Sequence, residues 1–109
     1  MLYNMDNKLI RKQVGQKIYT IKKVVEDSVY QTDNEELLLV KNTVEKIILD
    51  NQRTNQITIK ALSPVLVVCS ENKIDEEYDE LYLEKGSCVQ FVKLNNIWYI
   101  IASDGIKLN

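Results

Sequence analysis

The densest group of chemically capable side chains is the run Asp75-Glu76-Glu77-Tyr78-Asp79-Glu80, which holds five carboxylates in six residues. Carboxylate oxygens are the ligands that calcium and other hard cations prefer, so a metal site is one interpretation. The run lacks the alternating Asp-x-Asp-x-Asp-Gly spacing that wraps a bound ion, and a solvated acidic loop is the favoured interpretation. Such a loop would also discourage neighbouring molecules from pairing edge to edge. The sequence therefore predicts no cofactor, and the metal site is the weaker alternative.

Other signals of catalysis are missing from the sequence. It contains no histidine, which is the commonest general base and a frequent zinc ligand. Its three glycines, Gly15, Gly86 and Gly105, lie too far apart to form a phosphate-binding loop. Cys69 and Cys88 lie in strand-like runs, where cysteine behaves as a small buried hydrophobe, so we expect two free thiols. These observations predict that the protein is not an enzyme.

Charge is divided unevenly along the chain. Residues 1–23 carry a net charge of +5, whereas the remainder carries −7. A basic arm on an acidic body is typical of a docking element, and the acidic body disfavours binding to a nucleic-acid backbone. We expect residues 1–16 to form a short N-terminal arm or helix that anchors the protein to a larger assembly; a frayed terminus is the alternative. Its apolar and basic anchoring residues are Leu2, Met5, Lys8, Leu9, Ile10, Arg11 and Lys12.

No apolar run approaches the roughly 18 residues of a transmembrane helix, and no secretory signal pattern follows Met1. We therefore expect no membrane partner.

Short apolar runs between turn signals fill the chain from residue 17 onward. Polar turns are expected at residues 26–28, 84–86 and 104–105, and Pro64 must precede the run 65–69. Residues 35–49 fit either one helix or the two strands 37–40 and 46–49, of which we favour the strands. About eight to ten short strands at this spacing predict an all-β domain over residues 17–109, a small jelly-roll-like β-sandwich.

The anchor of this predicted fold is a hairpin around Asn95-Asn96, because Asn tolerates the left-handed conformation that a tight turn needs. Alternation places Phe91 on one face of the first strand. On the second strand it places Trp98 on one face, and Tyr99 and Ile101 on the opposite face. Both faces are apolar, so we expect a partner sheet to cover one and a neighbouring subunit to cover the other. The four residues are predicted contacts of the fold and of an oligomer.

A wider pattern of residues resembles a known class of protein. It comprises Lys46-Ile47-Ile48-Leu49-Asp50, Thr54-Asn55-Gln56-Ile57-Thr58-Ile59-Lys60, Ile74-Asp75, Leu81-Tyr82-Leu83 with Gly86, Val89 and Phe91 after it, and Trp98-Tyr99-Ile100-Ile101-Ala102-Ser103-Asp104-Gly105. In the order and spacing of these motifs, the chain resembles small all-β modules of bacteriophage fibres and other virion appendages. The chain departs from those modules at Glu76, where the usual turn glycine is missing.

The resemblance implies a structural virion protein, commonly a homotrimer, that is fixed to other virion proteins by its N-terminal segment. Some modules of this kind bind host glycans, and the six tyrosines of the chain make a carbohydrate- or receptor-binding module the alternative. We therefore expect a non-enzymatic protein of the phage virion that oligomerises and docks through residues 1–16.

Overall fold

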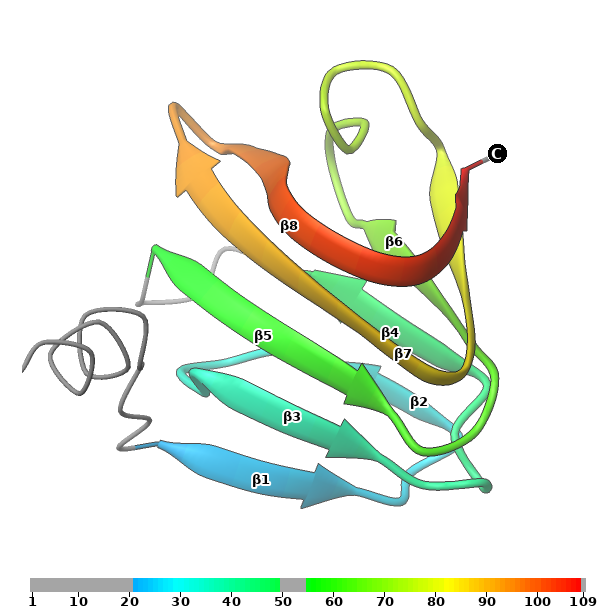
Figure 1. The fold of residues 1–109 in the computed structure, drawn as a ribbon. Coiled ribbons are helices and arrows are strands. Elements are labelled where there is room, and N and C mark those ends of the chain that lie inside the picture. The colour runs from blue at the N-terminus through cyan, green and yellow to red at the C-terminus, as the bar shows by residue number, and fades with distance from the viewer. Residues whose placement is uncertain (1–20, 50–54, 109) are drawn as a thin grey trace, which may run out of the picture.

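The computed structural model describes residues 21–49 and 55–108, which form eight β-strands and no helix (Figure 1). The predicted all-β class is confirmed, and residues 35–49 form two strands rather than a helix. The anchoring arm predicted for residues 1–16 lies outside the described residues. The strands are β1 (Lys22–Val25), β2 (Val29–Gln31), β3 (Leu37–Val40), β4 (Lys46–Leu49), β5 (Gln56–Ala61), β6 (Val65–Cys69), β7 (Glu80–Leu94) and β8 (Ile97–Leu108).

The strands form one folded sheet with the order β1-β3-β5-β7-β6-β4-β2, to which β8 is added along β7. β1, β3 and β5 pair in parallel, and β2, β4 and β6 pair in parallel. Because the chain passes between these two sets after every strand, β1–β2, β3–β4 and β5–β6 are three coils stacked as in a β-solenoid. The two facing layers are those of a sandwich, but their parallel pairing differs from the antiparallel pairing of a jelly roll.

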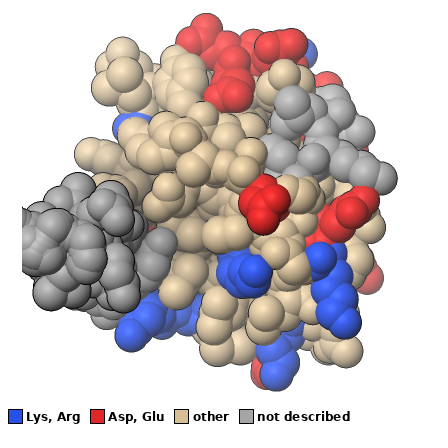
Figure 2. Space-filling view, in the orientation of Figure 1, with Lys and Arg blue, Asp and Glu red and all other residues tan. Residues whose placement is uncertain are grey.

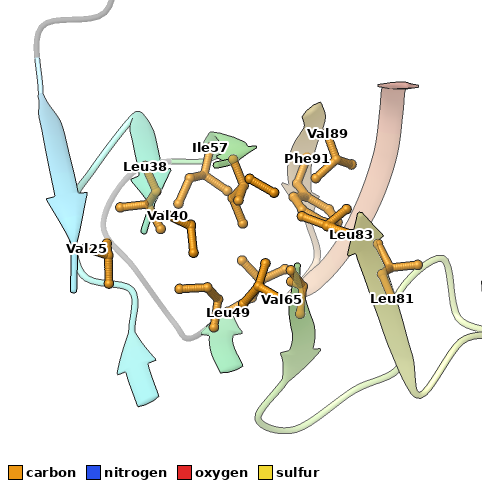
Figure 3. Packing of buried hydrophobic residues seen from close by; sticks show 14 of the residues in the cluster. Val25, Leu38, Val40, Leu49, Ile57, Val65, Leu81, Leu83, Val89 and Phe91 are labelled. Carbon is orange, nitrogen blue, oxygen red and sulfur yellow. The ribbon is translucent and has the colours of Figure 1, made fainter. Parts of the chain in front are cut away.

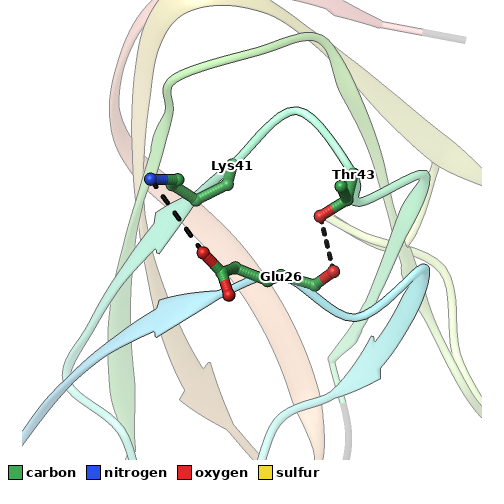
Figure 4. Close-up of polar contacts among 3 residues, drawn as sticks. All are labelled: Glu26, Lys41 and Thr43. Atoms are coloured by element: carbon green, nitrogen blue, oxygen red, sulfur yellow. Dashed lines mark hydrogen bonds and ion pairs between the residues drawn. The ribbon is translucent and has the colours of Figure 1, made fainter.

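Polar contacts at the corners join one coil to the next. In the turn between β1 and β2, the carboxylate of Glu26 lies 4.0 Å from Nζ of Lys41, and the carbonyl of Glu26 accepts a hydrogen bond from the Thr43 hydroxyl (Figure 4). The Glu45 amide donates to the Ser28 carbonyl at 2.8 Å. The ion pair is exposed and contributes little, so the backbone and hydroxyl contacts fix this corner.

β7 closes the stack at one end because it pairs with both layers. Its residues Glu80–Leu83 lie antiparallel to β6, and its residues Cys88–Val92 lie antiparallel to β5. The turns predicted at residues 84–86 and 104–105 are wrong, because β7 and β8 run through them without a break. Gly86 and Gly105 have φ angles of 90° and 79°, so they bend the two strands from one layer to the other.

The core lies between the two layers (Figure 3). Alternate residues of β3, β4 and β6 and of the two paired parts of β7 are buried in it, as expected for sheets that pack face to face. The rings of Phe91 and Trp98 meet edge to face, with centroids 6.4 Å apart. The largest fully buried side chains are Phe91, Leu38, Ile47, Leu49, Ile57, Ile59, Ile74, Leu81, Leu83, Val25 and Val40.

Candidate interaction surface

The predicted hairpin is present, with its tip at Asn95-Asn96. Their φ angles of 53° and 65° are those of a two-residue turn in which both central residues are left-handed. On one side of the hairpin, Phe91 and Trp98 are buried in the core, 0% and 3% exposed. They belong to the core and lie too deep to contact another subunit.

The opposite side of the hairpin is apolar and open. Val92 pairs with Tyr99 and Leu94 pairs with Ile97, so these side chains are neighbours across the two strands. Leu94 is 61% exposed and Ile101 is 58% exposed, while the other three are half-buried. We call Val92, Leu94, Ile97 and Tyr99, together with the exposed Ile101 at the β-bulge that follows them, the hairpin face.

Two of the predicted contact residues, Tyr99 and Ile101, belong to the hairpin face. Their position is compatible with contact to a neighbouring subunit, and that contact stays a prediction. The seven predicted anchoring residues from Leu2 to Lys12 all lie outside the described residues.

An acidic turn lies beside the hairpin. Ile74 and Tyr78 exchange backbone hydrogen bonds of 2.9 and 2.8 Å, and the chain reverses between them through Asp75 and Glu76. These two residues have φ angles of 58° and 61°, the region that favours glycine. Ile74 is fully buried and anchors the turn in the core. The turn therefore forms here with Glu76 in place of the expected glycine.

The acidic turn is fixed to β8 by three hydrogen bonds that sequence reasoning missed. The Asp75 amide donates to the Trp98 carbonyl at 2.9 Å, and the Ile100 amide donates to Oδ1 of Asp75 at 2.9 Å. The Tyr99 hydroxyl donates to the carboxylate of Glu76, which raises the pKa of Tyr99 above its usual value of 10.0. Two of the five carboxylates thus have partners on β8.

The remaining carboxylates of the run surround this turn, and Figure 2 shows acidic side chains gathered over the connection between β6 and β7. Within the described residues, no three His, Cys, Asp or Glu side chains are grouped so that they could hold a metal ion. The arrangement is therefore that of a surface turn docked on a strand.

A second polar group joins β2 to the connection between β2 and β3, at the end of the stack away from β7. Glu35 is only 5% exposed; its carboxylate accepts hydrogen bonds from the Tyr30 hydroxyl and, at 3.0 Å, from the Asp33 amide. Burial and the neighbouring Glu35 raise the pKa of Tyr30 well above its usual range. Nζ of Lys23 lies 5.1 Å from the centre of the Tyr30 ring. A lysine beside the core on an edge strand hinders further strands from adding there.

One open hollow of about 310 Å³ lies on the outer side of β5, β7 and β8, lined by Thr58, Cys88, Gln90, Ala102, Ser103 and Asp104. Its lining includes one carboxylate and no aromatic ring, so it offers neither an acid–base pair nor a stacking platform for a sugar. Both cysteines are free thiols, as expected, and burial raises the pKa of Cys69 to about 11.

Comparison with known proteins gives no relative: no family model matches the chain, and no curated protein matches it. Among the described residues, no helix is long and apolar enough to cross a membrane.

Proposed function

We propose that the protein is a non-enzymatic structural protein of a bacteriophage virion, of fibre, head-fibre or decoration type. The hairpin face is the observation that carries this proposal. Its exposed Leu94 and Ile101 adjoin the half-buried Tyr99, and adjoining apolar side chains left in water are typical of a surface that another protein covers. The resemblance to phage appendage modules supplies the kind of assembly, a homotrimer that contacts itself through this face.

The N-terminal segment supplies the link to the particle. Residues 1–16 carry Lys8, Arg11 and Lys12 against Asp6, so the arm is basic while the body is acidic. Its partner in this proposal is another structural protein of the virion with an acidic surface, and the protein resides in the assembled virion.

Molar mass measured by light scattering tests the oligomer. We expect the parent chain to have the mass of three copies, and Ile101→Asp to lower that mass because a buried charge in the interface is unfavourable. Leu62→Asp is the matched control: Leu62 is 43% exposed but lies in the turn between β5 and β6. A monomeric parent, or equal effects of the two substitutions, would contradict the hairpin face as the interface.

Removal of residues 1–16 tests the anchor. The truncated chain should keep the parent's molar mass but lose cosedimentation with purified virions that lack the protein. If truncation alone dissociates the oligomer, the arm is the assembly element, and the division of roles proposed here is wrong.

Recognition of a host glycan is the second candidate, and one observation favours it. The half-exposed ring of Tyr99 lies beside the carboxylate of Glu76, which places an aromatic surface next to hydrogen-bond acceptors. Glycan-array binding that is lost in Tyr99→Ala and kept in Tyr82→Ala would support it. An array without a hit for the parent chain would contradict it.

A further inference from the structure

The outer edge of β8 is the edge that faces away from β7. Among the described strands, β8 pairs only with β7. An edge strand presents unpaired N–H and C=O groups, which form a template for pairing with another chain. On β8 the groups that would serve this purpose near the hairpin are the Trp98 carbonyl and the Ile100 amide.

Asp75 occupies both of these groups. Its amide donates to the Trp98 carbonyl, and its side-chain Oδ1 accepts from the Ile100 amide, each at 2.9 Å. One residue of a parallel neighbouring strand would make the same two bonds opposite Tyr99, because its N–H and C=O bond to residues on either side of its partner. The Asp75 carboxylate thus takes the place of a strand carbonyl.

Protection of the edge ends at Ile100. All five following residues, 101–105, are exposed, and Ile101 presents an apolar side chain there. The most direct partner for such an edge is the same stretch of a second copy, since antiparallel pairing about a twofold axis would align each strand with itself.

We propose that the Ile74–Tyr78 turn is an edge cap that covers residues 98–100 of β8 and so prevents a second copy of this chain from pairing along the whole edge, from the hairpin through residues 101–105. The cap acts through the two hydrogen bonds of Asp75 and not through the negative charge of the acidic run. It therefore differs from simple repulsion between acidic loops, and the two mechanisms predict different outcomes for neutral substitutions.

Four variants of the full chain separate these mechanisms. Asp75→Gly keeps the amide donor and suits the left-handed backbone, but it removes the acceptor for the Ile100 amide. Asp75→Asn keeps an oxygen acceptor and removes the charge. Glu77→Gln and Asp79→Asn remove charges of the acidic run at positions other than Asp75; the Asp79 carboxylate lies 3.6 Å from Nζ of the exposed Lys73.

The measurements are molar mass as a function of concentration and hydrogen exchange at the Ile100 amide. In Asp75→Gly we expect the Ile100 amide to exchange about tenfold faster and species larger than the parent's own assembly to form at lower concentration. The other three variants should match the parent in both measurements. Because every variant is compared with the parent's own mass, the result does not depend on the proposed homotrimer.

Two outcomes would overturn the proposal. One is faster exchange at Ile100 in Asp75→Gly with the parent's molar mass at every soluble concentration. The other is larger assemblies in Asp75→Asn, Glu77→Gln or Asp79→Asn, since this would show that charge keeps the copies apart.

Discussion

At the scale of single residues, Asp75 and Glu76 show how contacts maintain an unfavourable backbone. Each non-glycine residue in the left-handed region costs roughly 1 kcal/mol, and these two are consecutive. The turn persists because Ile74 is buried and because Asp75 and Glu76 both bond to β8. At Glu76, where the phage modules have a turn glycine, side-chain contacts therefore stabilise the turn in place of glycine.

If the backbone at Glu76 is strained, the presence of a Cβ atom at position 76 should lower the free energy of unfolding. Glu76→Gly and Glu76→Ala both remove the carboxylate that Tyr99 contacts, but only Ala keeps the strain at a φ of 61°. We expect Glu76→Gly to have the higher free energy of unfolding, by about 1 kcal/mol. Urea denaturation of the pair checks this difference. Equal stabilities would mean that the turn does not hold residue 76 in the left-handed region.

The Tyr30–Glu35 contact predicts a loss of stability at alkaline pH. The folded state raises the pKa of Tyr30 above its ordinary value of 10.0, mainly through burial and then through Glu35. A group whose pKa is raised by folding stabilises fully below the pKa of the unfolded state, and the contribution disappears as the pH rises through the folded pKa. Stability should therefore fall as the pH rises above about 10.

Tyr30→Phe isolates that contribution. The variant should lose stability at neutral pH, because Glu35 loses a donor, but its unfolding free energy should fall less steeply above pH 10. Tyr82→Phe, which removes a tyrosine hydroxyl from β7, is the matched control. Urea unfolding from pH 8 upward gives the slopes, and parallel slopes for parent and Tyr30→Phe would contradict the assignment.

At the scale of elements, sequence patterns located strands well and their partners poorly. The hairpin at Asn95-Asn96 and the strands β3, β4 and β6 were predicted because local signals define them: turn-forming Asn, short apolar runs, and Pro64 ahead of β6. Parallel stacking was not predicted, because alternation shows which side chains are buried but not which strand lies alongside. Gly86 and Gly105 carry a turn signal in sequence, yet long strands use them as bends.

On the candidate surface, too, the sequence predicted positions within one strand but not contacts between separate elements. Tyr99 and Ile101 were predicted on the side of the hairpin opposite Trp98, since a period of two relates residues within one strand. The β-bulge between the pairs Phe91–Ile100 and Gln90–Ala102 interrupts this period at Ile101, and no local signal predicted it. The bond between Asp75 and Ile100 was not predicted, because it joins residues from separate elements and depends on a left-handed turn at two non-glycine residues. The sequence showed Asp75 as the first residue of an acidic run, and a turn at Ile74-Asp75 was indicated only by the resemblance.

The bend at Gly105 allows β8 to follow β7 across both layers. We therefore expect Gly105→Ala to lower the free energy of unfolding strongly. A Cβ atom on Gly105 would lie 2.8 Å from Oγ of Ser87, which is 3% exposed and donates a hydrogen bond to the Gly105 carbonyl. A Cβ atom on Gly86 would meet nothing within 4 Å, although its φ of 90° is equally unfavourable for Ala.

We expect Gly105→Ala to lower the unfolding free energy by about 2–3 kcal/mol and Gly86→Ala by about 1 kcal/mol. The difference measures the clash with Ser87. Chemical denaturation checks both variants, and Ser87→Ala combined with Gly105→Ala should recover part of the difference. Equal losses at the two glycines would show that β8 shifts freely away from Ser87.

At the scale of the whole molecule, the two ends of the stack differ. At one end β7 pairs with β5, β6 and β8, so both layers continue into one hairpin. At the other end β1 and β2 each pair with a single described strand. In a stack where each coil contacts mainly its neighbours, stability is a sum of local terms, and the end with fewer neighbours opens at lower free energy.

Hydrogen exchange of the full chain should therefore show a gradient along the stack. Amides of β1 and β2 should exchange first, those of β3 and β4 next, and those of β5 and of residues 88–92 of β7 last, because this last group has paired strands on both sides and lies farthest from the β1–β2 end. Mass spectrometry of peptides from each coil resolves this order. Equal protection in all coils would mean that the chain opens only as one cooperative unit. Protection of β1 and β2 that exceeds β5 would mean that a further strand covers that end, since a strand with one neighbour cannot be protected more than one between two.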